Sequence, residues 1–263
     1  MEIELKGGGV LSRRREGSGD NFIFLPGGPG LGAESLLPLI DGLGSPASFW
    51  TLDYCRSSRL ADWQSSVVDL AGRLERMILV GHSFGGMLLL SIPELEKTFG
   101  SAVRGWAFLS SSPGLAWKRL WVERGQDAAF PEAVRESERL EKELAASPTE
   151  DKYRALFLSW LPFYFEPEAL ARGRRLLSGC SYFPSAYALE AAFMKDYDAR
   201  WIPKAKTLVI AGEVDRVTPL ECFSQDPRFC GPNVECRSIA RAGHFPWVEN
   251  LPAVAAALTG AFP

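Results

Sequence analysis

Short apolar runs alternate with longer segments of mixed polarity along most of the chain. The runs are rich in β-branched and aromatic residues and are bounded by turn-forming residues, a pattern typical of strands that are buried on both faces of a parallel sheet. We predict such strands at residues 21–25, 48–53, 76–81, 105–110, 206–212 and 234–240, preceded by an antiparallel pair at residues 1–5 and 9–15.

The segments between these runs have helical character. The clearest are residues 61–75, 84–99 and 246–262, and a kink or early end is expected at Pro93 within the second of them. Strands that alternate with helices pair in parallel through right-handed crossovers. The sequence therefore predicts the α/β fold class, with a mostly parallel central sheet between two layers of helices.

One connection is much longer than a crossover helix needs. It joins the strand that ends near Ser111 to the strand that begins at Lys206, and it contains a charged helical segment, an aromatic stretch and a further helical segment, at residues 127–147, 156–170 and 186–201. We therefore predict a helical cap inserted into an α/β core, with the core formed by residues 1–111 and 206–263 and the cap by residues 112–205.

Composition narrows the class of partner. Apolar residues make up 46% of the chain and the formal net charge is −3, with no cationic cluster longer than Arg13–Arg15, so we expect neither nucleic acid nor a membrane as a partner. Five cysteines without a CxxC pair and only two histidines argue against a zinc site. The first residues lack the pattern of an export signal, which makes the cytoplasm the expected compartment.

The strongest chemical signal is the pentapeptide Gly81-His82-Ser83-Phe84-Gly85. It lies where a predicted strand turns directly into a predicted helix, which is the setting in which G-x-S-x-G presents a nucleophilic serine. A serine at so sharp a turn adopts an unfavourable backbone conformation at a cost of about 1–3 kcal/mol. The alternative is that the motif arose by chance and that Ser83 only caps the helix.

A serine hydroxyl becomes a useful nucleophile when a neighbouring base accepts its proton. His82 adjoins the serine, so we expect its side chain to point away from the nucleophile and to pack under the loop. His244 follows the predicted strand 234–240 and lies at the carboxyl edge of the sheet, where active sites of α/β proteins form. We predict His244 as the base, the alternative being a structural loop histidine.

A third group must orient the imidazole and stabilise its cation. Asp215 follows the predicted strand 206–212 at the same edge of the sheet, although it is also suited to cap the turn before Pro219, and Glu213 is a nearby competitor. The chain order Ser83, Asp215, His244 is the order expected for α/β hydrolases.

The segments "GHSFGG", "AGEVDRVTP" and "AGHFPWVEN" resemble the nucleophile, acid and histidine segments of the α/β-hydrolase superfamily. The helical insertion also falls where that superfamily places its cap. The loop "PGGPGLG" is similar to the HGGPG loop of proline iminopeptidases, with Pro26 in place of the histidine. Two further departures from that branch are residues 53–59, which lack its glycines, and the elbow, which is more like that of esterases and lactonases.

This resemblance implies that Ser83 attacks a carbonyl group, that His244 transfers the proton and that Asp215 orients His244. It also implies an oxyanion hole formed by the backbone amides of Gly28 and Phe84. The glycine-rich loop is then neither a phosphate cradle, since no Lys-Ser/Thr pair follows it, nor a linker, since it joins two core strands. No metal or organic cofactor is implied.

The expected function is that of a serine hydrolase acting on a small carboxylic ester, lactone or thioester. One alternative is a proline iminopeptidase-like aminopeptidase, which needs a carboxylate for the substrate's ammonium group, with Glu166, Glu168 and Glu190 as candidates. Another is a non-catalytic fold that binds a small ligand. Candidates for the wall of the substrate pocket, unless they form the core of the cap, are Trp117, Trp121, Trp160, Phe163, Tyr164 and Phe165, and Glu166 is a further weak candidate for substrate contact.

Overall fold

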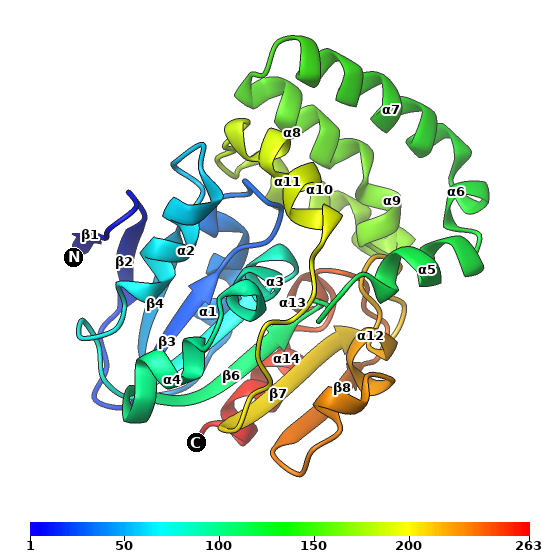
Figure 1. Cartoon of the computed structure of the whole chain (residues 1–263). Coiled ribbons are helices and arrows are strands. Elements are labelled where there is room, and N and C mark those ends of the chain that lie inside the picture. Colours follow the sequence, from blue (N-terminus) through cyan, green and yellow to red (C-terminus); the bar gives the residue numbers. More distant parts are fainter.

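The computed structural model describes all residues, 1–263, and contains one eight-stranded sheet (Figure 1). The strand order is β1-β2-β4-β3-β5-β6-β7-β8. β1 and β2 pair antiparallel, β2 pairs antiparallel with β4, and all other pairs are parallel. The strands are β1 (Glu2–Glu4), β2 (Val10–Arg15), β3 (Asn21–Leu25), β4 (Ser48–Asp53), β5 (Met77–His82), β6 (Val103–Leu109), β7 (Lys206–Gly212) and β8 (Val234–Ile239). Every strand predicted from the sequence is present.

Two layers of helices cover the sheet, so the predicted three-layer α/β fold is confirmed (Figure 1). Side chains alternate across each strand: in β3, Phe22 and Phe24 belong to one buried apolar cluster, whereas Ile23 and Leu25 belong to the other. The first cluster includes residues of α1 (Leu37–Gly42), α13 (Pro246–Glu249) and α14 (Leu251–Ala261). The second includes residues of α2 (Leu60–Val68), α3 (Phe84–Ser91), α4 (Leu95–Phe99) and α12 (Glu221–Ser224).

Some predicted helices are shorter than expected or divided. The helix predicted over residues 61–75 is α2 and ends at Val68. The helix predicted over residues 84–99 ends at Ser91, before Pro93, and resumes as α4. The last helix is likewise divided at Asn250 into α13 and α14, because the side chain of Asn250 caps the second of them. The single-turn 3₁₀ helices of the core are η1 (Ala33–Leu36), η2 (Gly100–Ala102) and η4 (Pro227–Phe229). None of the helices is long and apolar enough to cross a membrane.

Residues 116–195 form a group of helices beyond the carboxyl ends of the parallel strands, and residues 196–205 then run back along the core to the start of β7 (Figure 1). The elements are α5 (Ala116–Glu123), α6 (Gln126–Ala129), α7 (Pro131–Ala146), α8 (Glu150–Ser159), α9 (Leu161–Tyr164), η3 (Pro167–Ala169), α10 (Leu170–Ser178) and α11 (Ser185–Lys195). Several buried cap side chains, among them Leu144 and Phe165, belong to the same apolar cluster as one face of the sheet. The cap therefore shares its hydrophobic core with the rest of the protein. We retain the division at residues 111 and 206 as a proposal about domains.

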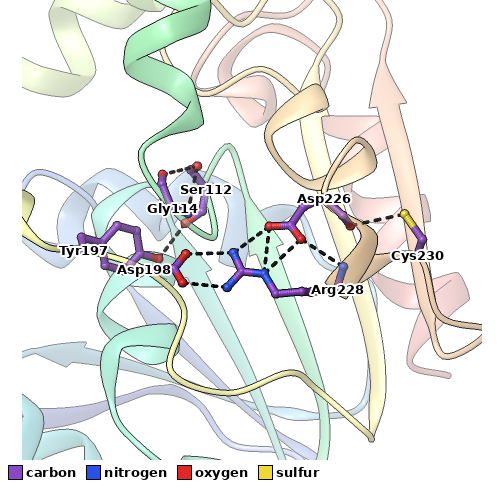
Figure 2. Close-up of polar contacts among 7 residues, drawn as sticks. All are labelled: Ser112, Gly114, Tyr197, Asp198, Asp226, Arg228 and Cys230. Carbon is purple, nitrogen blue, oxygen red and sulfur yellow. Dashed lines mark hydrogen bonds and ion pairs between the residues drawn. The ribbon is translucent and has the colours of Figure 1, made fainter.

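Polar contacts join the two segments that connect the cap to the core (Figure 2). The chain leaves the core near Ser112 and returns near Tyr197, whose hydroxyl donates to the Ser112 carbonyl oxygen at 2.7 Å. Beside it, both terminal nitrogens of Arg228 donate to Asp198 at 2.8 Å, and one of them also donates to Asp226 at 2.7 Å. A bidentate pair such as that of Arg228 and Asp198 fixes the relative orientation of the two side chains as well as their distance. The returning segment is thereby held against the core.

Candidate active site

The turn between β5 and α3 holds Ser83 in a strained conformation, with φ 50° and ψ −120°. Close packing explains the glycines around it. A β-carbon at residue 81 would lie 2.5 Å from the Cα atom of Gly86, and one at residue 85 would lie 2.6 Å from the carbonyl oxygen of Leu25. The Ser83 side chain makes no capping hydrogen bond to the helix that follows. The structure therefore argues against the alternative in which Ser83 is only a helix cap.

The structure brings Ser83, His244 and Asp215 together at the carboxyl edge of the sheet. His244 Nε2 lies 3.0 Å from Ser83 Oγ, and His244 Nδ1 lies 3.1 Å and 3.2 Å from the two carboxylate oxygens of Asp215. All three residues are buried. The carboxylate accepts a hydrogen bond from Nδ1–H, which leaves the lone pair on Nε2 facing the hydroxyl group of Ser83. This is the hydrogen-bond chain that an activated serine requires.

Asp215 has the environment of a carboxylate that stays ionised. Its Oδ1 atom also accepts the backbone N–H groups of Val217 and Thr218, at 2.9 Å and 3.0 Å. Burial alone would raise the pKa of this carboxyl group, but His244 and, to a smaller extent, the N–H of Thr218 lower it below its ordinary value. Asp215 thus both caps the turn and contacts the imidazole. The competitor Glu213 lies outside this cluster, and its carboxylate accepts the N–H of Arg241.

His82 is buried beside His244. Its Nε2–H donates to the carbonyl oxygen of His244 at 3.0 Å, and its ring packs against Phe245 and Trp247. Burial is the main cause that lowers the pKa of His82 to about 3, with a further contribution from His244. The ring is therefore neutral, and it supports the backbone of His244 while also bordering the cavity above Ser83.

Two backbone amides near Ser83 have no partner inside the protein. The amide of Gly28 donates no hydrogen bond to another backbone group, and that of Phe84 is the first of α3, where a helix supplies no acceptor. Gly28 has φ +116°, and a β-carbon there would lie 2.7 Å from the Gly30 nitrogen. The cap supports this loop, since the Tyr153 hydroxyl donates to the Pro29 carbonyl oxygen at 2.5 Å. The loop therefore offers one free donor, the Gly28 amide, and the start of α3 offers the other, the Phe84 amide.

A cavity of about 140 Å³ lies above Ser83, between the core and the cap. Of the residues predicted to contact substrate, Trp117, Trp160 and Tyr164 line it. The Tyr164 ring also stacks on His244, with ring centroids 5.5 Å apart. Wall residues that the sequence did not single out are Glu141, Tyr153, Leu156, Phe157, Tyr187, Val217 and Phe245.

Four residues predicted to contact substrate lie outside the cavity: Trp121, Phe163, Phe165 and Glu166. Phe165 is buried in the apolar cluster that the cap shares with the sheet, where its ring stacks on Phe245. Trp121 and Phe163 pack against each other within the cap, with ring centroids 4.7 Å apart, so for these two the cap-core alternative is the correct one. The Glu166 carboxylate faces a separate surface groove and pairs with Arg216 at 2.6 Å. The prediction that these side chains line the substrate pocket is therefore corrected.

Two carboxylates from different cap helices line the cavity, Glu141 on α7 and Glu190 on α11. Neither makes a hydrogen bond or an ion pair to another residue. Burial is the main cause that raises the pKa of Glu190 to about 7, and the negative charge of Glu141 adds to it. The cavity thus combines aromatic walls with unpaired acceptors that disfavour an anionic group.

Comparisons with known proteins agree with this architecture. The model of the alpha/beta hydrolase family matches residues 22–257. No curated protein matches the chain. An esterase from Thermogutta terrifontis is 15% identical with a TM-score of 0.70, and the match covers 99% of this chain and 97% of that one.

Two further solved structures are similar over the whole chain. An esterase from Exiguobacterium antarcticum is 16% identical with a TM-score of 0.68, covering 99% of this chain and 98% of the esterase. A proline iminopeptidase-related protein from Thermus thermophilus is 19% identical with a TM-score of 0.67, covering 99% of this chain and 95% of that protein. At sequence identities this low, the structural similarity shows the fold alone. The family match spans most of the sequence, and the chain therefore belongs to the alpha/beta hydrolase family.

Proposed function

We propose that the protein is a serine hydrolase that cleaves a small carboxylic ester, lactone or thioester through an acyl-enzyme on Ser83. The observation that supports this most is the buried hydrogen-bond chain from Ser83 through His244 to Asp215, which opens onto the cavity. Membership of a hydrolase family agrees with it.

The proposed reaction uses only groups of this chain and water. His244 takes the hydroxyl proton while Ser83 Oγ attacks the carbonyl carbon of the substrate. The free amides of Gly28 and Phe84 donate to the oxyanion that forms, and one such donor is typically worth about 3 kcal/mol of barrier. His244 then protonates the leaving group. A water molecule, deprotonated by His244, releases the acyl group and regenerates Ser83.

The size of the cavity predicts a preference for short substrates. Its volume of about 140 Å³ is close to the space that holds one benzene-sized molecule. We expect kcat/KM for p-nitrophenyl acetate or butyrate to exceed that for the dodecanoate by at least about tenfold, because the longer chain does not fit under the cap. A panel of nitrophenyl esters measured at one pH tests this. Equal rates along the panel would show that the cavity does not select the acyl group.

A second function, that of a proline iminopeptidase-like aminopeptidase, is favoured by one specific observation. Glu141 and Glu190 border the cavity without partners, and carboxylates are the natural acceptors for the ammonium group of an aminoacyl substrate. One of the similar structures is also described as proline iminopeptidase-related. We place this function second for two reasons: Pro26 replaces the histidine of that branch, and the elbow around Ser83 is more like that of esterases.

The two functions predict opposite substrate orders. For the ester hydrolase we expect p-nitrophenyl acetate to be cleaved faster than prolyl p-nitroanilide, and the Glu190→Gln variant to change the acetate rate by less than about threefold. For the aminopeptidase the order reverses, and Glu190→Gln lowers kcat/KM for the prolyl substrate by roughly tenfold or more, because the loss of a charged hydrogen bond costs about 1.5–3 kcal/mol. Glu132→Gln, on the exposed start of α7, is the matched control.

A further inference from the structure

One carboxylate joins the loop of the base to the cap. Glu249, at the end of α13, accepts the N–H of Gly243 at Oε2 over 2.6 Å and the N–H of Glu166 at Oε1 over 2.8 Å. Gly243 directly precedes His244, and Glu166 belongs to the cap segment that follows α9. Each oxygen of Glu249 therefore holds one of two backbone segments that are far apart in the sequence.

The same two segments are in direct contact beside Glu249. The N–H of His244 donates to the carbonyl oxygen of Tyr164 at 2.8 Å. A β-carbon at residue 243 would lie 2.5 Å from that oxygen, so only glycine allows this approach. Glu249 adds to this contact, because its carboxylate accepts hydrogen bonds from the neighbouring amides of Gly243 and Glu166. The position of His244 relative to the cap is thus set by backbone contacts.

The cap segment is also joined to the loop of the acid. The Glu166 carboxylate accepts from Arg216 at 2.6 Å, and Arg216 directly follows Asp215. Asp215 in turn accepts from His244. The contacts therefore link three segments in a closed ring: the loop that carries Asp215, the cap segment at Glu166 and the loop that carries His244. Glu249 is the only side chain that bonds to the backbone of both the His244 loop and the cap.

We infer that Glu249 is a positioning residue, whose carboxylate holds the amides of Gly243 and Glu166 and so keeps His244 Nε2 within reach of Ser83. The inference rests on the proposed function of Ser83 and His244. Glu249 borders a separate surface groove and does not line the cavity, so it has no contact with substrate. A shift of about 1 Å in a reacting group typically costs about a hundredfold in rate, which makes this indirect support important for turnover.

The test is the Glu249→Gln variant. Two N–H donors converge on this side chain, and an amide offers one acceptor oxygen and one NH₂ group, so a donor faces a donor at one of the two contacts. We expect kcat for p-nitrophenyl acetate to fall roughly 10- to 100-fold with KM within about threefold. A fluorophosphonate should label Ser83 more slowly by a similar factor. A role confined to stability would lower the melting temperature and leave the labelling rate of the folded protein unchanged.

Glu168→Gln is the matched control. Glu168, one of the sequence's candidates for binding a substrate ammonium group, lies outside the cavity, so that candidacy falls. It borders the same groove as Glu249, and its carboxylate makes no hydrogen bond. We expect it to behave as the wild type. The inference is overturned if folded Glu249→Gln protein shows wild-type kcat and labelling, or if KM rises while kcat is unchanged. Should the variant not fold, amide hydrogen exchange in the wild type decides: slow exchange at both Gly243 and Glu166 supports the clamp, and fast exchange at either overturns it. If the wild-type protein itself is neither labelled nor active on esters, the proposed function has failed instead.

Discussion

Replacing Ser83 with alanine is expected to abolish nearly all ester hydrolysis, lowering kcat by roughly 10⁴- to 10⁶-fold for every ester that the wild-type protein cleaves. The reason is that the acyl-enzyme cannot form without Oγ, while the oxyanion donors and the cavity remain. Steady-state rates on p-nitrophenyl acetate measure the effect. Labelling with a fluorophosphonate, which should be lost in the same variant, ties the rate to this one oxygen.

The fold should tolerate this change. Ser83 is buried, its hydroxyl contacts only His244, and alanine adopts the same strained turn at a similar cost. We therefore expect a melting temperature close to that of the wild type. Ser91→Ala, at the other end of α3, is the matched control and should keep full activity. Wild-type rates in Ser83→Ala protein would refute the assignment, and a folded wild-type protein that resists labelling would favour the non-catalytic, ligand-binding alternative.

The core and the hydrogen-bond chain of Ser83 could be predicted because their requirements are local and few. G-x-S-x-G between an apolar run and a helix has one geometric solution, since the glycines are needed where backbone atoms approach within 3 Å of an added β-carbon. With two histidines in the chain and one of them beside Ser83, elimination leaves His244. Parallel strands end at one edge of the sheet, so residues that follow them, such as Asp215, come together there.

The cap could not be predicted to the same depth. The ring centroids of Trp121 and Trp160 lie 5.3 Å apart, yet Trp160 lines the cavity and Trp121 does not. The difference depends on how the short helices at Pro162 and Pro167 turn relative to their neighbours. Glu190 appears from the sequence to be one of many acids on solvated helices. Nothing in its neighbourhood along the chain indicates that it lines the same cavity as Ser83.

Glu249 illustrates a further limit. It lies five residues after His244 in a segment that matched the superfamily's histidine region as a whole, and no motif singled it out. Its partners are the backbone amides of Gly243 and Glu166, and any residue but proline carries such a donor. Side-chain chemistry can be read from sequence when the reaction demands a particular residue type. A contact with backbone becomes visible only when the chain's path is known.

Replacing Asp215 with asparagine is expected to lower kcat by about 10⁴-fold while the protein stays folded. Asparagine keeps an oxygen for the amides of Val217 and Thr218, so the turn after β7 should persist. Its NH₂ group then faces His244 Nδ1 and favours the tautomer that carries its proton on Nε2. A protonated Nε2 cannot accept the hydroxyl proton of Ser83, although it still lies about as close to Oγ as the 3.0 Å seen here.

The measurement is kcat and the fluorophosphonate labelling rate of Asp215→Asn beside those of Glu213→Gln. Glu213 is the matched control because it is the other acid at the end of β7 and its carboxylate contacts only the Arg241 amide in this region. We expect Glu213→Gln to retain activity within about threefold, as surface substitutions away from a site usually do. The reverse result, an active Asp215→Asn and an inactive Glu213→Gln, would transfer the acid's role to Glu213. Equal, near-wild-type rates in both would mean that His244 acts without a carboxylate partner, and the proposed hydrogen-bond chain would then be reduced to Ser83 and His244.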